Sequence, residues 1–131
     1  MRARAPLRLG LAGGGTDLSP FCDRHGGLVL NATIDLYAYA TLSPLSGDRV
    51  RFAAIDQQAD VEYPLAAAVP AEGALRLHEG VYNRIVREFR GGAPLAVEIA
   101  TTSDAPAGSG LGASSTLVVA MVCGFAEYLS L

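Results

Sequence analysis

The sequence predicts an α+β fold with a mixed or antiparallel sheet, and three observations lead to this class. Residues 28–42 alternate between apolar and polar side chains, which is typical of a half-buried strand. Residues 75–89 carry apolar side chains four positions apart, which is typical of an amphipathic helix. Because several strands are followed by a helix, a strand and a second helix, the order favours α+β over a regularly alternating fold.

The expected strands begin near the N-terminus. In the first, Ala5–Ala12, leucines alternate with arginine or glycine until three consecutive glycines end it. A loop follows as far as the glycine pair at 26–27, and the long alternating strand Leu28–Leu42 comes next. Two shorter strands are expected at Arg49–Ile55 and Val61–Pro64, joined by the polar turn DQQAD.

The second half of the sequence predicts two helices with a strand between them. The helix Leu75–Phe89 buries one apolar face, and the glycine pair at 91–92 ends it. A strand is expected at Leu95–Ile99, followed by a glycine-rich loop and the helix Ser114–Leu129. This last helix is apolar nearly all round, with Glu127 as its only charge, so we expect it to be buried on several sides.

Composition bounds the possible functions. The 131 residues are half apolar, which predicts one domain spanning 1–131. A net charge of −3 without a basic block argues against a nucleic-acid partner. No apolar run approaches the ~20 residues of a membrane span, and the N-terminus does not resemble a signal peptide, so we expect a cytoplasmic protein. Two cysteines and two histidines, isolated from one another, predict neither a disulfide framework nor a zinc site.

The glycine-rich segment PAGSGLGASS, residues 106–115, is the first candidate binding motif. Glycines between a strand and a helix let the backbone approach a ligand, and the free N–H groups of the helix start attract anions. All ten cationic residues are arginines, so a phosphate loop that depends on lysine is excluded. The segment is therefore either a phosphate-binding loop or a flexible connection whose serines cap the helix.

A second motif, APLRLGLAGGGTDL at residues 5–18, decides between these readings. With PAGSGLGASS it resembles the GHMP kinases, the superfamily of galactokinase, homoserine kinase, mevalonate kinase and phosphomevalonate kinase. The glycine loop is similar to the family's phosphate loop, Pro-x-x-x-Gly-Leu-x-Ser-Ser, although Ala113 stands where a serine is common. The resemblance implies the ribosomal protein S5 domain 2-like fold of the GHMP kinase N-terminal domain, with the helices packed on one face of the sheet.

The resemblance also implies residue roles around ATP and Mg²⁺. Ser114 falls where the family places a magnesium-binding hydroxyl, and oxygen is the ligand type that Mg²⁺ prefers. The missing hydroxyl at Ala113 leaves Ser115 as an alternative, and Ser115 and Thr116 could instead cap the helix. The residues expected to contact ATP are Ala107, Gly108, Ser109, Gly110, Leu111, Gly112, Ala113, Ser114 and Ser115.

The N-terminal motif supplies the expected acceptor site. The resemblance implies that Asp17 accepts hydrogen bonds from sugar hydroxyls and that Arg8 stabilises charge on the transferred phosphoryl group. An Asx turn at Asp17 and a solvent-exposed Arg8 are the alternatives. The remaining expected substrate-binding residues are Gly13, Gly14, Gly15 and Thr16.

Within the superfamily, GGGTD with GGLVLNATID and VRF…DQQ most resembles bacterial heptose kinases. This resemblance implies transfer of the ATP γ-phosphoryl group to the anomeric hydroxyl of D-glycero-D-manno-heptose 7-phosphate. The alternatives are a fucose- or galactose-type 1-kinase and a non-catalytic nucleotide-binding fragment. The family's catalytic aspartate and second domain lie beyond the glycine loop, so we expect a truncated N-terminal domain, inactive alone, with a homodimer possible. Arg24 and Arg51 are candidates for holding the substrate's own phosphate.

Overall fold

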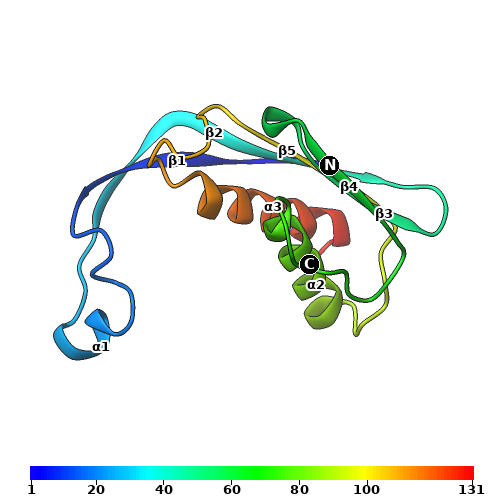
Figure 1. Cartoon of the computed structure of the whole chain (residues 1–131), viewed down its shortest axis with the longest axis horizontal. Coiled ribbons are helices and arrows are strands. Elements are labelled where there is room, and N and C mark those ends of the chain that lie inside the picture. Colours follow the sequence, from blue (N-terminus) through cyan, green and yellow to red (C-terminus); the bar gives the residue numbers. More distant parts are fainter.

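The computed structural model describes residues 1–131 and contains one mixed sheet with helices below it (Figure 1). A 3-10 turn, η1 (Ile55–Gln57), lies between the third and fourth strands. The other elements, in chain order, are β1 (Arg2–Ala12), α1 (Phe21–His25), β2 (Leu30–Pro44), β3 (Arg49–Ala54), β4 (Ala59–Pro64), α2 (Arg76–Phe89), β5 (Val97–Ser103) and α3 (Ala113–Leu129).

The five strands lie in the order β1-β2-β5-β3-β4. Only β3 and β5 are parallel, and every other neighbouring pair is antiparallel. Both long helices, α2 and α3, cover the same face of the sheet (Figure 1), and the core lies between them and the strands. This arrangement confirms the predicted α+β class with a mixed sheet. The largest buried side chains are Tyr82, Phe52, Phe125, Leu7, Leu42, Ile99 and Met121.

The predicted elements are present, with differences at their ends. The strand expected at 95–99 instead runs from Val97 to Ser103, because its threonines continue the antiparallel ladder with β2. The short helix α1 was not predicted, since the segment before Gly26 was expected to be a loop. No helix of the structure is both long enough and apolar enough to span a membrane.

The buried face of α2 differs from the predicted stripe. Phe89, expected to be buried, is 54% exposed, whereas His78 and Glu79 are buried. One polar atom of each side chain has a partner inside the protein, whereas His78 Nδ1 and Glu79 Oε2 are buried without one. His78 Nε2 lies 2.8 Å from Thr101 Oγ1, and the Tyr63 hydroxyl donates to Glu79 Oε1 over 2.8 Å. The hydrogen bond to Glu79 raises the pKa of Tyr63.

Burial of His78 makes stability depend on pH. Burial lowers the pKa of this imidazole below its ordinary value of 6.5, although the charge of Asp56 opposes the change. Just below pH 6.5, therefore, His78 of the folded protein is still neutral, whereas the same imidazole in the unfolded chain already binds a proton. The contribution of His78 to the unfolding free energy is therefore greatest above pH 6.5 and falls as the pH decreases below that value. The loss is at most about 1.4 kcal/mol per pH unit for one proton.

Chemical unfolding at about pH 8 and about pH 5.5 measures this loss. The decrease in unfolding free energy should be clear in the wild type and smaller in His78→Gln, which keeps a polar group near Thr101 without titrating. An equal decrease in both proteins would assign the pH dependence to carboxyl groups instead. Glu88 is one such group, because hydrogen bonds from Arg84 and Arg87 lower its pKa.

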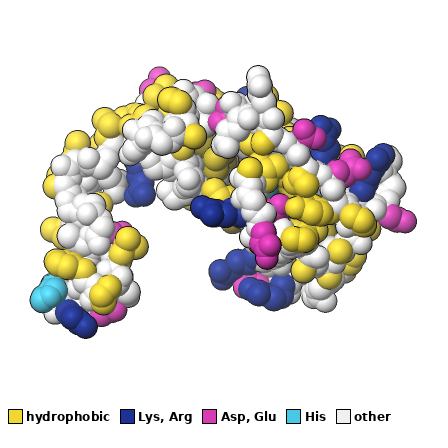
Figure 2. Space-filling model, viewed as in Figure 1, with side chains coloured by type: hydrophobic (Ala, Val, Ile, Leu, Met, Phe, Trp, Pro, Cys, Tyr) yellow, Lys and Arg dark blue, Asp and Glu magenta, His cyan; other side chains and the backbone are white.

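The strands β1 and β2 continue beyond the helices as an arm, defined here as residues 9–31. In Figure 1 the arm curves away to the left and carries α1 at its tip. The alternation that predicted β2 is real, but its first half has no helix beneath it, so Leu28 is 85% exposed and Leu30 is 60% exposed. The space-filling view shows an open hollow between the arm and the helices (Figure 2).

The helix α3 is only partly covered, although burial on several sides was expected. Val119 is 52% exposed, and Val122 lies in an apolar groove of about 470 Å³ between α2 and α3. Leu77, Ile85 and Val118 also line this groove. The possible homodimer stays untested, because nothing in the structure shows what covers the groove.

Candidate active site

The glycine loop connects β5 to α3 and presents a row of free main-chain N–H groups. Gly108, Gly110 and Gly112 have positive φ values of 81°, 75° and 73°, a conformation that favours glycine. The N–H of Ser109 bonds to the Pro106 carbonyl oxygen over 3.2 Å, whereas the N–H groups of residues 110–115 have no acceptor within the protein. Together with the dipole of α3, these N–H groups form a site for an anion.

A small hydrophobic cluster holds the loop against the sheet. The side chain of Leu111 packs on Leu7 and Leu117, which are buried with two alanines. The Leu111 carbonyl oxygen also accepts a hydrogen bond from the Arg8 N–H over 3.1 Å. The two sequence motifs, far apart along the chain, are thus joined by packing and by a main-chain bond.

A cavity of about 400 Å³ opens beside the loop. It extends from the glycines to η1 and the first turn of α2, so it is long enough for more than a phosphate group. Sequence reasoning did not identify Asp56, Gln57 and Leu77 as site residues, although the DQQ segment contributed to the resemblance. The lining residues are Asp56, Gln57, Leu77, Ser103, Ala105, Ala107, Gly108, Ser109, Gly110, Gly112, Ala113, Ser114, Ser115 and Leu117.

The three hydroxyl residues at the start of α3 differ in their partners. The hydroxyls of Ser115 and Thr116 both donate to the Gly112 carbonyl oxygen over 3.0 Å. Ser114 makes no side-chain hydrogen bond and lines the large cavity, so its oxygen is available to a ligand. No group of three His, Cys, Asp or Glu side chains could hold a metal ion. A magnesium ion would therefore fit here only with phosphate oxygens among its ligands.

Arg8 lies beside the start of α3 and has no carboxylate partner. The register of the β1–β2 pairing shifts between Pro6 and Arg8. The Arg8 guanidinium comes within 3.5 Å of the Ser115 hydroxyl, and its Nε lies 2.9 Å from where a Cβ on Gly112 would be. An unpaired arginine at the positive end of a helix dipole leaves an excess of positive charge, which an anion would neutralise.

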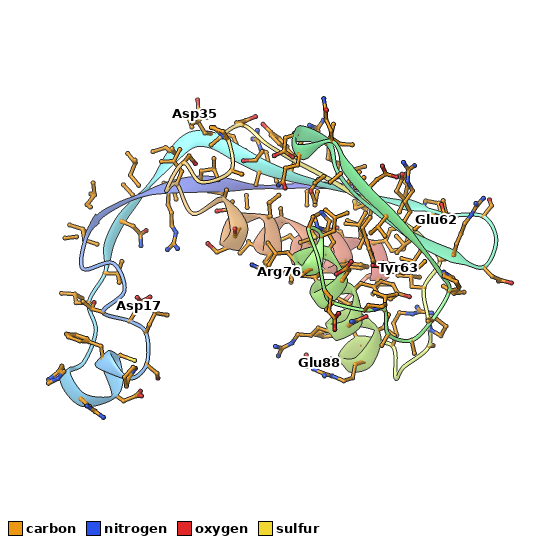
Figure 3. All side chains as sticks on the ribbon, viewed as in Figure 1. Asp17, Asp35, Glu62, Tyr63, Arg76 and Glu88 are labelled. Carbon is orange, nitrogen blue, oxygen red and sulfur yellow. The ribbon has the colours of Figure 1, made fainter.

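A second cavity, of about 140 Å³, brings both motifs to one place. Arg8 and Asp17 line it together with Gly110 and Gly112 of the glycine loop, and Asp17 makes no hydrogen bond that would fix it as a turn residue. Figure 3 shows Asp17 on the side of the arm that faces the helices. The cavity is lined by Arg8, Gly10, Gly14, Gly15, Asp17, Val29, Asn31, Gly110 and Gly112.

Thr16 and Gly13 do not line this cavity but hold the turn that carries Asp17. The Thr16 hydroxyl donates to the Gly13 carbonyl oxygen over 2.7 Å and accepts from the Leu28 N–H over 3.1 Å. A side chain on Gly13 would overlap the Leu28 carbonyl oxygen, and one on Gly27 would overlap that of Thr16. The two sides of the arm therefore approach each other through these glycines.

The other candidate residues lie elsewhere. Asp104 accepts from the Tyr37 N–H over 2.8 Å and from the Tyr39 hydroxyl over 3.3 Å, so its carboxylate ties the end of β5 to β2. Arg51 pairs with Glu98 over 3.0 Å and lines neither cavity of the site, so nothing here supports a role in holding a substrate phosphate, which stays a prediction. Arg24 lies in α1, at the tip of the arm.

Comparison with known families agrees with this geometry. Residues 76–131 match the family model of the GHMP kinases N terminal domain. This range includes the glycine loop and α3 but not Arg8 and Asp17. Over these residues the chain is similar to the N-terminal domain of the GHMP kinases. Its fold is also that of the mevalonate kinase of Methanococcus jannaschii, with a TM-score of 0.81 at 14% identity, over 98% of this chain and 40% of the other.

More similar relatives carry heptose in their names. The chain is 46% identical over its whole length to a D-glycero-alpha-D-manno-heptose 7-phosphate kinase of Campylobacter jejuni, of which it covers 38%. It is 51% identical, with a TM-score of 0.90, to a structure described as a D-glycero-D-manno-heptose 1-phosphate kinase of Bacteroides thetaiotaomicron, over 99% of this chain and 42% of the other. The chain thus spans about two fifths of the length of these relatives.

Proposed function

We propose that this chain is the N-terminal portion of a cytoplasmic, ATP-dependent sugar kinase. The acceptor is the anomeric hydroxyl of D-glycero-D-manno-heptose 7-phosphate, and the product is the 1,7-bisphosphate. The observation that carries this proposal is the small cavity where Arg8, Asp17 and the phosphate-loop glycines meet. The heptose kinase names of the relatives support the choice of sugar.

The chain's own residues divide the work of phosphoryl transfer, which depends mainly on positioning and charge stabilisation. The free N–H groups of 110–115 bind the phosphates of ATP, and Ser114 offers its hydroxyl to Mg²⁺, which supplies further charge neutralisation when bound. The large cavity leads from there to Asp56 and Gln57, where the rest of the nucleotide has room.

Arg8 and Asp17 act at the acceptor side. Arg8 lies beside the first turn of α3, so its guanidinium can stabilise charge on the phosphoryl group as it leaves ATP. Asp17 accepts hydrogen bonds from sugar hydroxyls, which orients the anomeric oxygen toward the phosphate loop. A separate carboxylate, outside the residues described here, takes the proton of the attacking hydroxyl.

Turnover by the full-length protein tests the proposal. With ATP and Mg²⁺, heptose 7-phosphate should be consumed faster than fucose or galactose, and phosphorus NMR should show a new anomeric phosphate. Preference for fucose or galactose would identify a different sugar 1-kinase. ATP binding without turnover of any of these sugars would favour a non-catalytic nucleotide-binding protein.

A further inference from the structure

Asn31 is a polar residue of the small cavity that the sequence motifs did not identify. It lies near the start of β2, where it pairs with Gly10 of β1. The cavity that Asn31 lines also contains Arg8 and Asp17. Asn31 thus belongs to the same wall as the two residues proposed to act on the acceptor.

The Asn31 side chain has no partner inside the protein. None of the side-chain hydrogen bonds in the structure involves its amide, and the neighbouring β1 residue Gly10 has no atom within 4 Å of where its Cβ would be. Asparagine is unfavourable within strands, and here it forms none of the local hydrogen bonds that favour it at turns. Its amide is therefore free to bond a ligand in the cavity.

Among the polar side chains of the small cavity, Asn31 differs in its hydrogen-bonding groups. The other lining residues are glycines and Val29, so only three polar side chains face a ligand. The Arg8 guanidinium can only donate hydrogen bonds, and the ionised Asp17 carboxylate can only accept them. Asn31 can do both, which suits a sugar hydroxyl that also donates and accepts.

We infer that Asn31 is a specificity-determining residue that hydrogen-bonds one hydroxyl of the acceptor sugar beside those held by Asp17. This inference rests on the proposed function. A site that hydrogen-bonds a substrate hydroxyl discriminates strongly against sugars that lack it or present it with the other stereochemistry, because polar groups are then left unpaired. Asn31 would thus help to choose among sugars that all possess an anomeric hydroxyl.

Steady-state kinetics of the full-length protein test this role. The panel contains heptose 7-phosphate and analogues in which each ring hydroxyl is removed or inverted in turn. Asn31→Ala should lower kcat/KM for the parent sugar by about tenfold to a hundredfold, while KM for ATP stays unchanged. For the analogue that lacks the contacted hydroxyl, wild type and Asn31→Ala should have equal kcat/KM.

Thr41→Ala is the matched control, because it removes a polar group from the same strand at a position that pairs with Arg2, outside the cavity. It should keep the parent kcat/KM and the wild-type preference among analogues. An unchanged preference in Asn31→Ala, alongside normal wild-type turnover, would overturn the inference and leave the proposed function intact. Absence of turnover of every sugar by the wild type would overturn both.

Discussion

Replacing Arg8 with alanine in the full-length protein should lower kcat by about 10²- to 10³-fold, the usual cost of removing one preorganised group that stabilises transition-state charge. Arg8 lies beside the start of α3 without a carboxylate partner, so its charge is available to the transferred phosphoryl group. Arg8→Lys should recover only part of the rate, because an ammonium group cannot reproduce the planar guanidinium. The measurement is steady-state kinetics with ATP and heptose 7-phosphate.

Arg2→Ala provides the matched control for this prediction. Arg2 is also in β1, but its guanidinium stacks on the Tyr39 ring at 4.8 Å. Its removal should therefore leave kcat close to the wild-type value. If Arg8→Ala were as active as Arg2→Ala, Arg8 would be an exposed arginine without a catalytic role. Because Arg8 forms no ion pair, unfolding temperatures should change little, which separates a catalytic effect from misfolding.

Gly27→Ala should reduce kcat/KM for the sugar by at least about tenfold, as expected when a strained or displaced turn costs ~1–3 kcal/mol. The new methyl group would overlap the Thr16 carbonyl oxygen and lie 2.8 Å from Asp17 Cα. The turn that carries Asp17 must then move away from β2. The unfolding temperature should stay nearly constant, because no residue of the arm belongs to the main core. Parallel kinetics and thermal unfolding test both parts.

Gly26→Ala separates overlap from backbone strain. Gly26 has a φ of 69°, which disfavours alanine, but no atom lies within 4 Å of its Cβ position. Its substitution should therefore cost less activity than Gly27→Ala. Equal losses would mean that flexibility of the arm, rather than the Thr16 contact, positions Asp17.

The sequence was a good guide to the elements and a poorer guide to what covers them. Period-two alternation predicted β2 because it reports a strand with two different faces, yet Leu28 and Leu30 face solvent. Alternation cannot reveal how much of a strand's length is covered by the helices that pack on it. The buried face of α2 was predicted wrongly for a related reason. His78 and Glu79 are polar residues, and the sequence does not show that Thr101 and Tyr63 provide them with hydrogen-bond partners in the core.

The candidate site was predictable where its residues follow a local motif. Glycines before an apolar helix predict free N–H groups at that point, and the structure has them at 110–115. The bond between the Arg8 N–H and the Leu111 carbonyl oxygen has no sequence signal, because it depends on strand order and on the irregular pairing of β1. Asn31 and Gln57 were missed for the same reason: their residue types are common in many surface positions.

The separation of the arm from the helices has an evolutionary consequence. The glycine loop, the proposed phosphate site, is anchored on buried leucines, so substitutions there endanger folding as well as the proposed chemistry. Most of the residues proposed to surround the acceptor lie in the arm, which contributes no residue to the main hydrophobic core. Substitutions at a few arm positions could therefore change the sugar specificity during evolution, while the proposed ATP site stays the same.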